Sequence, residues 1–257
     1  MSTLEEQLGG KDRADVFKQF PWWLLVILAF LALMAYLIIT NEEYNAAFQF
    51  IIGELGTVED LLNGEFLAFI GKGISVTIYV TFVSFIISVI LGLLAGLGRL
   101  SKNTFIRNLA ITYVEFVRGL PVLVLIFTFA FVVVPEISDA LGVDNQAIPG
   151  TTRGIIALAF FYGGMTAGQS MRHVILPQAV RNILPALGND FIAILKDSSL
   201  LSVLAVREIT QQSRLYAGTS FRFRETYLVL TFLYLSMTVA LSLLLQWYGR
   251  RLGTDER

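Results

Sequence analysis

Apolar residues gather in long runs along this chain and alternate with polar, charged segments. The first run covers residues 21–40 and follows a polar leader, residues 1–20. Because about 20 helical residues cross the hydrocarbon core of a bilayer, this run predicts a transmembrane helix. A cleaved signal peptide is the alternative, but the leader and the run are long for one, and no small-x-small cleavage site follows. The run is therefore expected to stay in the chain as an anchor.

Further apolar runs predict spans at residues 74–97, 108–134 and 226–246. Two segments between them are weaker. Residues 154–162 form an apolar segment of nine residues, about half the length needed to cross, and residues 190–206 are interrupted by four polar residues. Composition supports a polytopic membrane protein, because 55% of the residues are hydrophobic and the mean hydropathy is +0.69.

Charges in the loops orient the predicted spans. Residues 41–72 carry six acidic residues and one lysine, and residues 135–144 are acidic, so both segments are expected outside. The first includes an interfacial helix around 44–54. Residues 99–107 carry three basic side chains and mark an inside loop, since cytoplasmic loops are rich in Lys and Arg. The two arginines near the C-terminus also suit a cytoplasmic end.

The short segment at 154–162 leaves the topology after Arg153 open. Its helix either continues through Gly163, Gly164 and Thr166, or it dips into the membrane and returns, which reverses every later span. Loop charges do not choose between these two arrangements. The continuing helix gives an all-α polytopic protein with about six transmembrane helices.

Two groups of polar residues lie at the edge of, or inside, apolar runs, where an unpaired ion is costly. Their members are Glu115, Arg118 and Pro121 in the first group, and Lys196, Asp197, Ser198 and Ser199 in the second. Arg118 either pairs with Glu115 at the inner interface or lines a polar route. Lys196 and Asp197 either serve a substrate path or pair with other helices, and the two serines can bond backbone carbonyls or a substrate.

Several functional classes are unfavoured by the composition. The chain has no cysteine and one histidine, so thiol chemistry, a zinc site and a histidine-based triad are not expected. No carboxylate cluster in the spans supports a membrane-embedded enzyme. An ion-coupled secondary carrier remains an alternative, although the internal repeat of broken helices typical of such carriers is not found. The chain also lacks the Gly-x-x-x-x-Gly-Lys-Ser/Thr loop that cradles nucleotide phosphates.

Three blocks in order resemble the integral membrane permease subunits of ABC importers, in the polar amino-acid branch that includes histidine, glutamine and glutamate/aspartate permeases. Residues 113–124 are similar to that branch's Glu-x-x-Arg-Gly-Thr-Pro-Leu pattern, with Leu120 in place of threonine. Gly164, nine residues, and then residues 174–179 resemble the second half of its cytoplasmic coupling motif. Residues 187–200 are close to its Asn-x-Phe…Lys-Asp-Thr-Ser-Leu pattern.

The resemblance implies a type I ABC importer fold, with an N-terminal extension and anchor in residues 1–66 and a permease domain in residues 67–251. It also implies that the chain translocates a polar amino acid across the plasma membrane without being an enzyme. The implied partners are a second permease subunit, an extracytoplasmic amino-acid-binding protein, and two cytoplasmic ATPase subunits, which would bind ATP and Mg²⁺. No cofactor or metal is expected in this chain, and no nucleic acid is expected as a partner.

The chain departs from the family pattern at the coupling motif. The positions of the family's Glu-Ala-Ala hold Leu158, Ala159 and Phe160, so the domain is expected to be shortened around residues 160–165. A transport-incompetent, permease-like chain is therefore a further alternative. The coupling residues that the resemblance implies are Gly164, Met171, Val174, Ile175, Leu176 and Pro177. On amphipathicity alone, this segment could instead be an interfacial helix.

Overall fold

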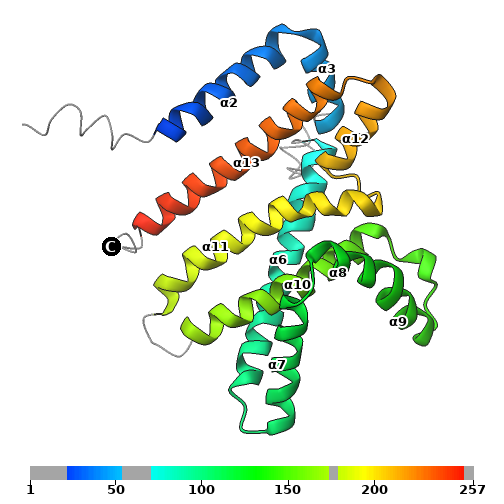
Figure 1. Ribbon diagram of the computed structural model, residues 1–257, viewed down its shortest axis with the longest axis vertical. Helices are drawn as coiled ribbons and strands as arrows, with labels where there is room; N and C mark the ends of the chain where they lie inside the picture. Colours follow the sequence, from blue (N-terminus) through cyan, green and yellow to red (C-terminus); the bar gives the residue numbers. More distant parts are fainter. Residues whose placement is uncertain (1–21, 54–70, 174–178, 252–257) are drawn as a thin grey trace, which may run out of the picture.

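The computed structural model describes residues 22–53, 71–173 and 179–251, and every regular element in these ranges is helical (Figure 1). The elements in chain order are α2 (Trp22–Thr40), α3 (Glu42–Ile52), α6 (Lys72–Arg99), α7 (Thr104–Arg118), α8 (Val122–Thr128), the π-helix η1 (Phe129–Val133), α9 (Val134–Ala140), the 3₁₀-helix η2 (Asn145–Ala147), α10 (Gly150–His173), α11 (Ala179–Asp197), the 3₁₀-helix η3 (Ser198–Leu204), α12 (Ile209–Ser220) and α13 (Phe223–Arg251).

Four helical stretches in the described ranges are long and apolar enough to cross a membrane. They are α2, α6, the continuous stretch Val122–Ala140 formed by α8, η1 and α9, and α13 over Phe223–Gly249. The expected anchor and the expected second and last spans are confirmed as helices at these places. The helix expected in the first outside loop is α3, whose start is capped where Asn41 Oδ1 accepts the Glu43 N–H at 2.9 Å.

The third span was predicted wrongly at its start. Residues 108–134 do not form one helix, because α7 ends at Arg118 and α8 begins after Pro121. Proline cannot donate a backbone hydrogen bond and its ring restricts the preceding residue, so a helix tends to stop before it and restart after it. The apolar stretch long enough to cross therefore begins at Val122.

The same span also ends later than predicted. Pro135 was expected to begin an outside loop, whereas the helix continues through it to Ala140. The π-turn η1 ends at Val133, two residues before this proline, and the Val134 N–H donates to the carbonyl of Phe129, five residues back. Such a widened turn relieves the clash that a proline ring makes with the preceding helical turn.

Helix α10 continues through Gly163 and Gly164, as the first of the two topological alternatives required. Its 24 residues span about 36 Å at 1.5 Å per residue, which is enough to cross a bilayer. Helix α10 packs most extensively on α6 and also contacts α7 and α11. Gly163 permits a close approach of α10 to α6 and α7, since a Cβ there would lie 2.7 Å from the Leu91 Cβ and the Tyr113 hydroxyl.

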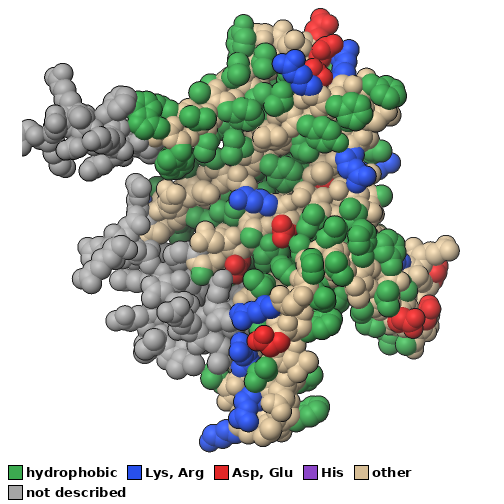
Figure 2. Space-filling view, viewed as in Figure 1, with side chains coloured by type: hydrophobic (Ala, Val, Ile, Leu, Met, Phe, Trp, Pro, Cys, Tyr) green, Lys and Arg blue, Asp and Glu red, His purple; other side chains and the backbone are tan. Residues whose placement is uncertain are grey.

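Helices α2, α13, α11 and α10 lie side by side in that order, each in contact with the next (Figure 1). The start of α2, the end of α10, the start of α11 and the end of α13 share one side of the molecule, while α3 and α12 lie at the opposite side. Lys and Arg side chains gather on the α6–α7 hairpin, and acidic side chains gather beside α9 (Figure 2). This separation agrees with the predicted inside and outside loops.

Candidate functional site

The first predicted group lies around the break between α7 and α8. Glu115 and Arg118 are both exposed near the end of α7, and exposed Pro121 is the cap residue before α8. No ion pair joins Glu115 to Arg118 in the part of the chain that the structure describes. Both charges are therefore available to water, lipid headgroups or another protein.

The second predicted group lies where α11 gives way to η3. Lys196 is exposed, whereas the neighbouring Asp197 is half-buried and accepts a hydrogen bond of 2.7 Å from the Tyr162 hydroxyl of α10. Ser198 is fully buried, and its hydroxyl donates to the Leu195 carbonyl at 2.7 Å. Ser199 is partly exposed at the start of η3. The structure thus gives Asp197 and Ser198 partners inside the protein and leaves Lys196 open.

A buried polar cluster next to this group was missed by the sequence reasoning. Glu208 is fully buried at the start of α12, and its carboxylate accepts the backbone N–H groups of Thr210 and Gln211, each at 2.7 Å. The Tyr234 hydroxyl of α13 donates to the same carboxylate at 3.1 Å and also hydrogen-bonds the Thr210 hydroxyl at 2.9 Å. We call Glu208, Thr210 and Tyr234 the Glu208 cluster. It joins α12 to α13.

The available sequence signal for this cluster was weak. Glu208 stands between apolar Val206 and Ile209 but outside the long runs, and glutamate is not among the preferred N-cap residues. Gln211 adds a buried carbonyl oxygen that accepts no hydrogen bond from any described residue. Such an acceptor is normally satisfied by ordered water or a bound polar group.

Burial raises the pKa of Glu208 from 4.5 to about 7, because removal from water disfavours the carboxylate more than its N–H and O–H donors favour it. The folded protein then binds more protons than the unfolded chain between about pH 4.5 and 7. We expect its melting temperature to fall as the pH rises through this window and to level off above it. Thermal unfolding in detergent should show a flatter profile for Glu208→Gln, with Glu136→Gln, an exposed carboxylate, as the control. Identical slopes in all three proteins would contradict the assignment.

The implied coupling residues fall into two sets. Val174, Ile175, Leu176 and Pro177 lie outside the described residues, while Gly164 and Met171 are part of α10. Gly164 is buried within that helix and not in a loop, and a Cβ there would lie 2.8 Å from the Val117 Cβ of α7. Its visible role is to let α7 and α10 approach closely.

The exposed charges of Glu115, Arg118 and Lys196 are available to contact a solute, whereas Asp197 and Ser198 help to position helices. Among the described residues, no three His, Cys, Asp or Glu side chains gather where they could hold a metal ion. Lys196 is exposed and the next residue, Asp197, is half-buried, at the end of α11, a helix in contact with both α10 and α13. In a membrane-embedded bundle, a cation needs water, a partner or a solute to stabilise it.

Comparison with known proteins agrees with this architecture. Residues 159–254 match the family described as binding-protein-dependent transport system inner membrane component. The chain is 32% identical to the probable glutamine ABC transporter permease protein GlnP of Bacillus subtilis (strain 168) over 201 residues, covering 70% of this chain and 91% of that protein. It is 29% identical to the glutamine transport system permease protein GlnP of Escherichia coli (strain K12), with coverage of 70% and 91%.

A solved structure shares the fold. The crystal structure of an amino acid ABC transporter with histidines superposes with a TM-score of 0.61 at 27% identity, covering 77% of this chain and 100% of that chain. The sequence match at 32% identity extends over nine-tenths of the relative. The chain therefore belongs to the family of binding-protein-dependent transport system inner membrane components, the multi-pass permease subunits of ABC importers.

Proposed function

We propose that this chain carries a polar amino acid across the plasma membrane as one permease half of an ATP-driven importer. The names of its relatives support the substrate class, since one is a glutamine transport system permease protein and another a probable glutamine ABC transporter permease protein. Side-chain chemistry agrees, because an exposed ammonium at Lys196 beside a carboxylate at Asp197 complements a zwitterionic solute. The main structural observation that supports this proposal is the exposure of Lys196 on α11, which contacts both α10 and α13.

In this proposal the work of transport comes from other subunits. The sequence has no phosphate-binding loop, so two cytoplasmic ATPases would bind ATP and Mg²⁺ and close on the permease pair. A second permease subunit would complete the path, and an extracytoplasmic binding protein would deliver the amino acid. ATP binding to the ATPases would shift the permease between its outward-facing and inward-facing conformations. It can do so only by as much free energy as ATP binding favours one conformation over the other.

We propose that Lys196, Asp197 and Ser199 line the substrate path and that Glu115, Arg118 and Pro121 border its inner end. Ser198 does not contact the solute in this proposal, because its buried hydroxyl already donates to the Leu195 carbonyl. Its role is to hold the backbone of the path in place. Exposure of Lys196, Glu115 and Arg118 supports this assignment. The hydrogen bond between Tyr162 and Asp197 fixes the end of α11 against α10.

We also propose the division into residues 1–66 and 67–251 and a permease domain shortened near residues 160–165. The lengths of the matches support the shortening. The match to the Bacillus subtilis protein runs over 201 residues, whereas 70% of the 257 residues of this chain is about 180. At least about 20 positions of the match therefore have no counterpart here. Of the implied coupling residues, Met171 and residues 174–177 would be what remains of the ATPase contact, whereas the buried Gly164 serves the packing of α10 on α7.

The test is ATP-dependent uptake in proteoliposomes that hold the chain with its partner subunits and the binding protein. With ATP inside and no ion gradient, we expect uptake of a polar amino acid such as glutamine to exceed the ATP-free control at least about tenfold. Uptake that requires an ion gradient and ignores ATP would favour a secondary carrier. ATP hydrolysis without uptake would favour the transport-incompetent alternative.

A further inference from the structure

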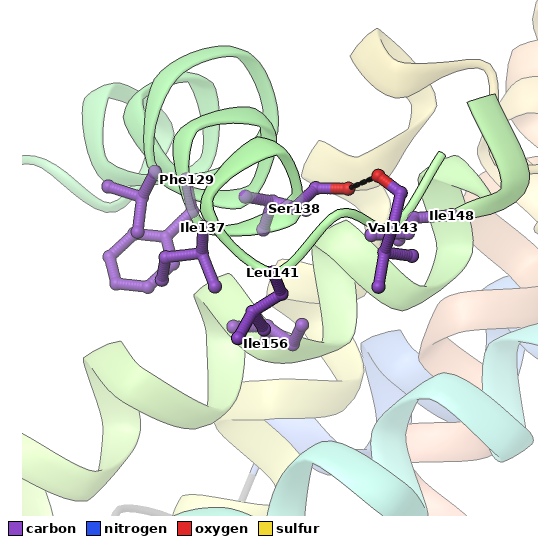
Figure 3. Close-up of a pocket in the computed structure, with 9 residues that line it drawn as sticks. Phe129, Ile137, Ser138, Leu141, Val143, Ile148 and Ile156 are labelled. Atoms are coloured by element: carbon purple, nitrogen blue, oxygen red, sulfur yellow. Dashed lines mark hydrogen bonds between the residues drawn. The ribbon is translucent and has the colours of Figure 1, made fainter. Parts of the chain in front are cut away.

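A cavity of about 200 Å³ lies beside the α8–η1–α9 stretch, away from the polar groups described above (Figure 3). Helix α10 and the connection after α9 complete its wall. We call it the outer apolar cavity. Its lining residues are Phe129, Val133, Val134, Ile137, Ser138, Leu141, Val143, Ile148 and Ile156.

The wall of this cavity offers no polar group to an occupant. Ser138 is the one hydroxyl in it, and that hydroxyl donates to the Val143 carbonyl at 2.7 Å (Figure 3). Water in a cavity needs two to four polar partners, and cavities lined by Leu, Ile and Phe instead stay dry or take apolar molecules. The outer apolar cavity therefore excludes the zwitterionic solute proposed for Lys196.

Hydrogen bonds from Arg153 tie together the segments that line the cavity. The guanidinium of Arg153 donates to the carbonyls of Ala130 and Asn145 at 2.7 Å each and to that of Ile148 at 3.1 Å. One side chain thus ties α10 to η1 and to the connection that closes the cavity. The π-turn η1 contributes Phe129 and Val133 to the wall, and π-turns occur frequently at functional sites.

The cavity is continuous with an apolar surface of a membrane span. Phe131, Val132, Ile137 and Leu141 are all more than half exposed in or just after the span Val122–Ala140. In a bilayer such a surface contacts acyl chains. Glu136 is exposed in α9, near the end of the span. Figure 2 shows acidic side chains gathered beside α9, and their negative charge favours an amine-bearing headgroup over an anionic one.

We propose that the outer apolar cavity binds an acyl-chain segment of a phospholipid with an amine headgroup. The acyl chain of the lipid enters from the surrounding bilayer and fills the space between Val133 on one wall and Ile156 on the other. The lipid headgroup then lies near Glu136. The proposal depends on the membrane location of the span and not on which solute the permease carries.

The test uses phosphatidylethanolamine with a photoactivatable diazirine in one acyl chain, added to membrane vesicles that contain the full chain and its partner subunits. After illumination, peptide mass spectrometry locates the adducts. We expect them to concentrate on the cavity residues Phe129, Val133 and Ile156 over Phe131 and Val132, which are exposed on the same span but lie outside the cavity. Val133→Phe, which fills the cavity, should lower labelling there at least about fivefold. Val132→Phe, the same change on the exposed neighbour, should leave it unaltered.

Ile156→Trp fills the cavity from the opposite wall and should repeat the loss if Val133→Phe does not accumulate. Adducts spread evenly along the exposed apolar residues of the span would overturn the proposal. So would cavity labelling that appears only when the chain is expressed without its partners, because a protein partner would then cover this surface in the assembly.

Discussion

Lys196→Ala is expected to lower transport at least about tenfold while the chain still inserts and accumulates in the membrane. The ammonium of Lys196 is exposed at the end of α11, whereas the neighbouring Asp197 and Ser198 are held by protein partners. Removing it therefore breaks no internal contact found in the structure but removes a charge from the proposed path. A tenfold loss corresponds to roughly 1.4 kcal/mol, a modest value for one charge-assisted contact. Uptake per inserted molecule in proteoliposomes measures it.

Two variants make this result specific. Lys196→Arg keeps the positive charge and should retain more transport than the alanine variant. Lys102→Ala removes an exposed lysine from the turn between α6 and α7 and should transport like the parent. If Lys196→Ala loses insertion and transport in equal measure, Lys196 is a structural residue and its place in the path is wrong.

Gly163→Ala should destabilise the folded chain by about 1–3 kcal/mol, the usual cost of forcing an extra methyl group into a packed interior. The new Cβ would lie 2.7 Å from the Leu91 Cβ and from the Tyr113 hydroxyl. The Leu91 Cβ is attached to the backbone of α6 and cannot rotate away. Tyr113 is held as well, since its hydroxyl donates to the Phe160 carbonyl at 2.7 Å. Thermal unfolding in detergent and the yield of folded protein measure the effect.

Gly218→Ala is the matched control. Gly218 lies in α12, and a Cβ there would meet no atom within 4 Å. Alanine favours a helix over glycine by about 1 kcal/mol, so this variant should be as stable as the parent or slightly more so. A Gly163→Ala protein that melts at the parent temperature would mean that α6 and α10 pack less closely than the structure shows.

The lipid-facing spans are readily predicted from sequence, whereas α10 and the helix breaks are not. The rest of the chain leaves much of α2, α6 and α13 uncovered and these helices are strongly apolar, so hydropathy alone identifies them. Helix α10 is covered by α6, α7 and α11, so small and polar residues replace apolar ones along it and the nine-residue apolar segment looks too short. Pro121 could have predicted the break after α7, but the π-turn before Pro135 has no sequence pattern that distinguishes it from an ordinary turn.

A buried contact at Asp197 was predictable from the sequence, but the partner of Asp197 was not. An aspartate inside an apolar run signals a buried contact, and the structure supplies Tyr162, 35 residues earlier in the chain. No periodicity links two positions so far apart before the helices are packed. Glu208 gave even less signal, because the Tyr234 hydroxyl that bonds it comes from α13, 26 residues later in the chain.

The polarity of α10 has a consequence for how the chain is made. A helix that is not apolar enough to be held by the bilayer alone gains its stability there from neighbouring protein. Helices α6 and α7, two of its packing partners, precede it in the sequence and leave the ribosome first. During synthesis, α6 and α7 can therefore form a docking surface in the membrane before α10, which needs that surface, emerges.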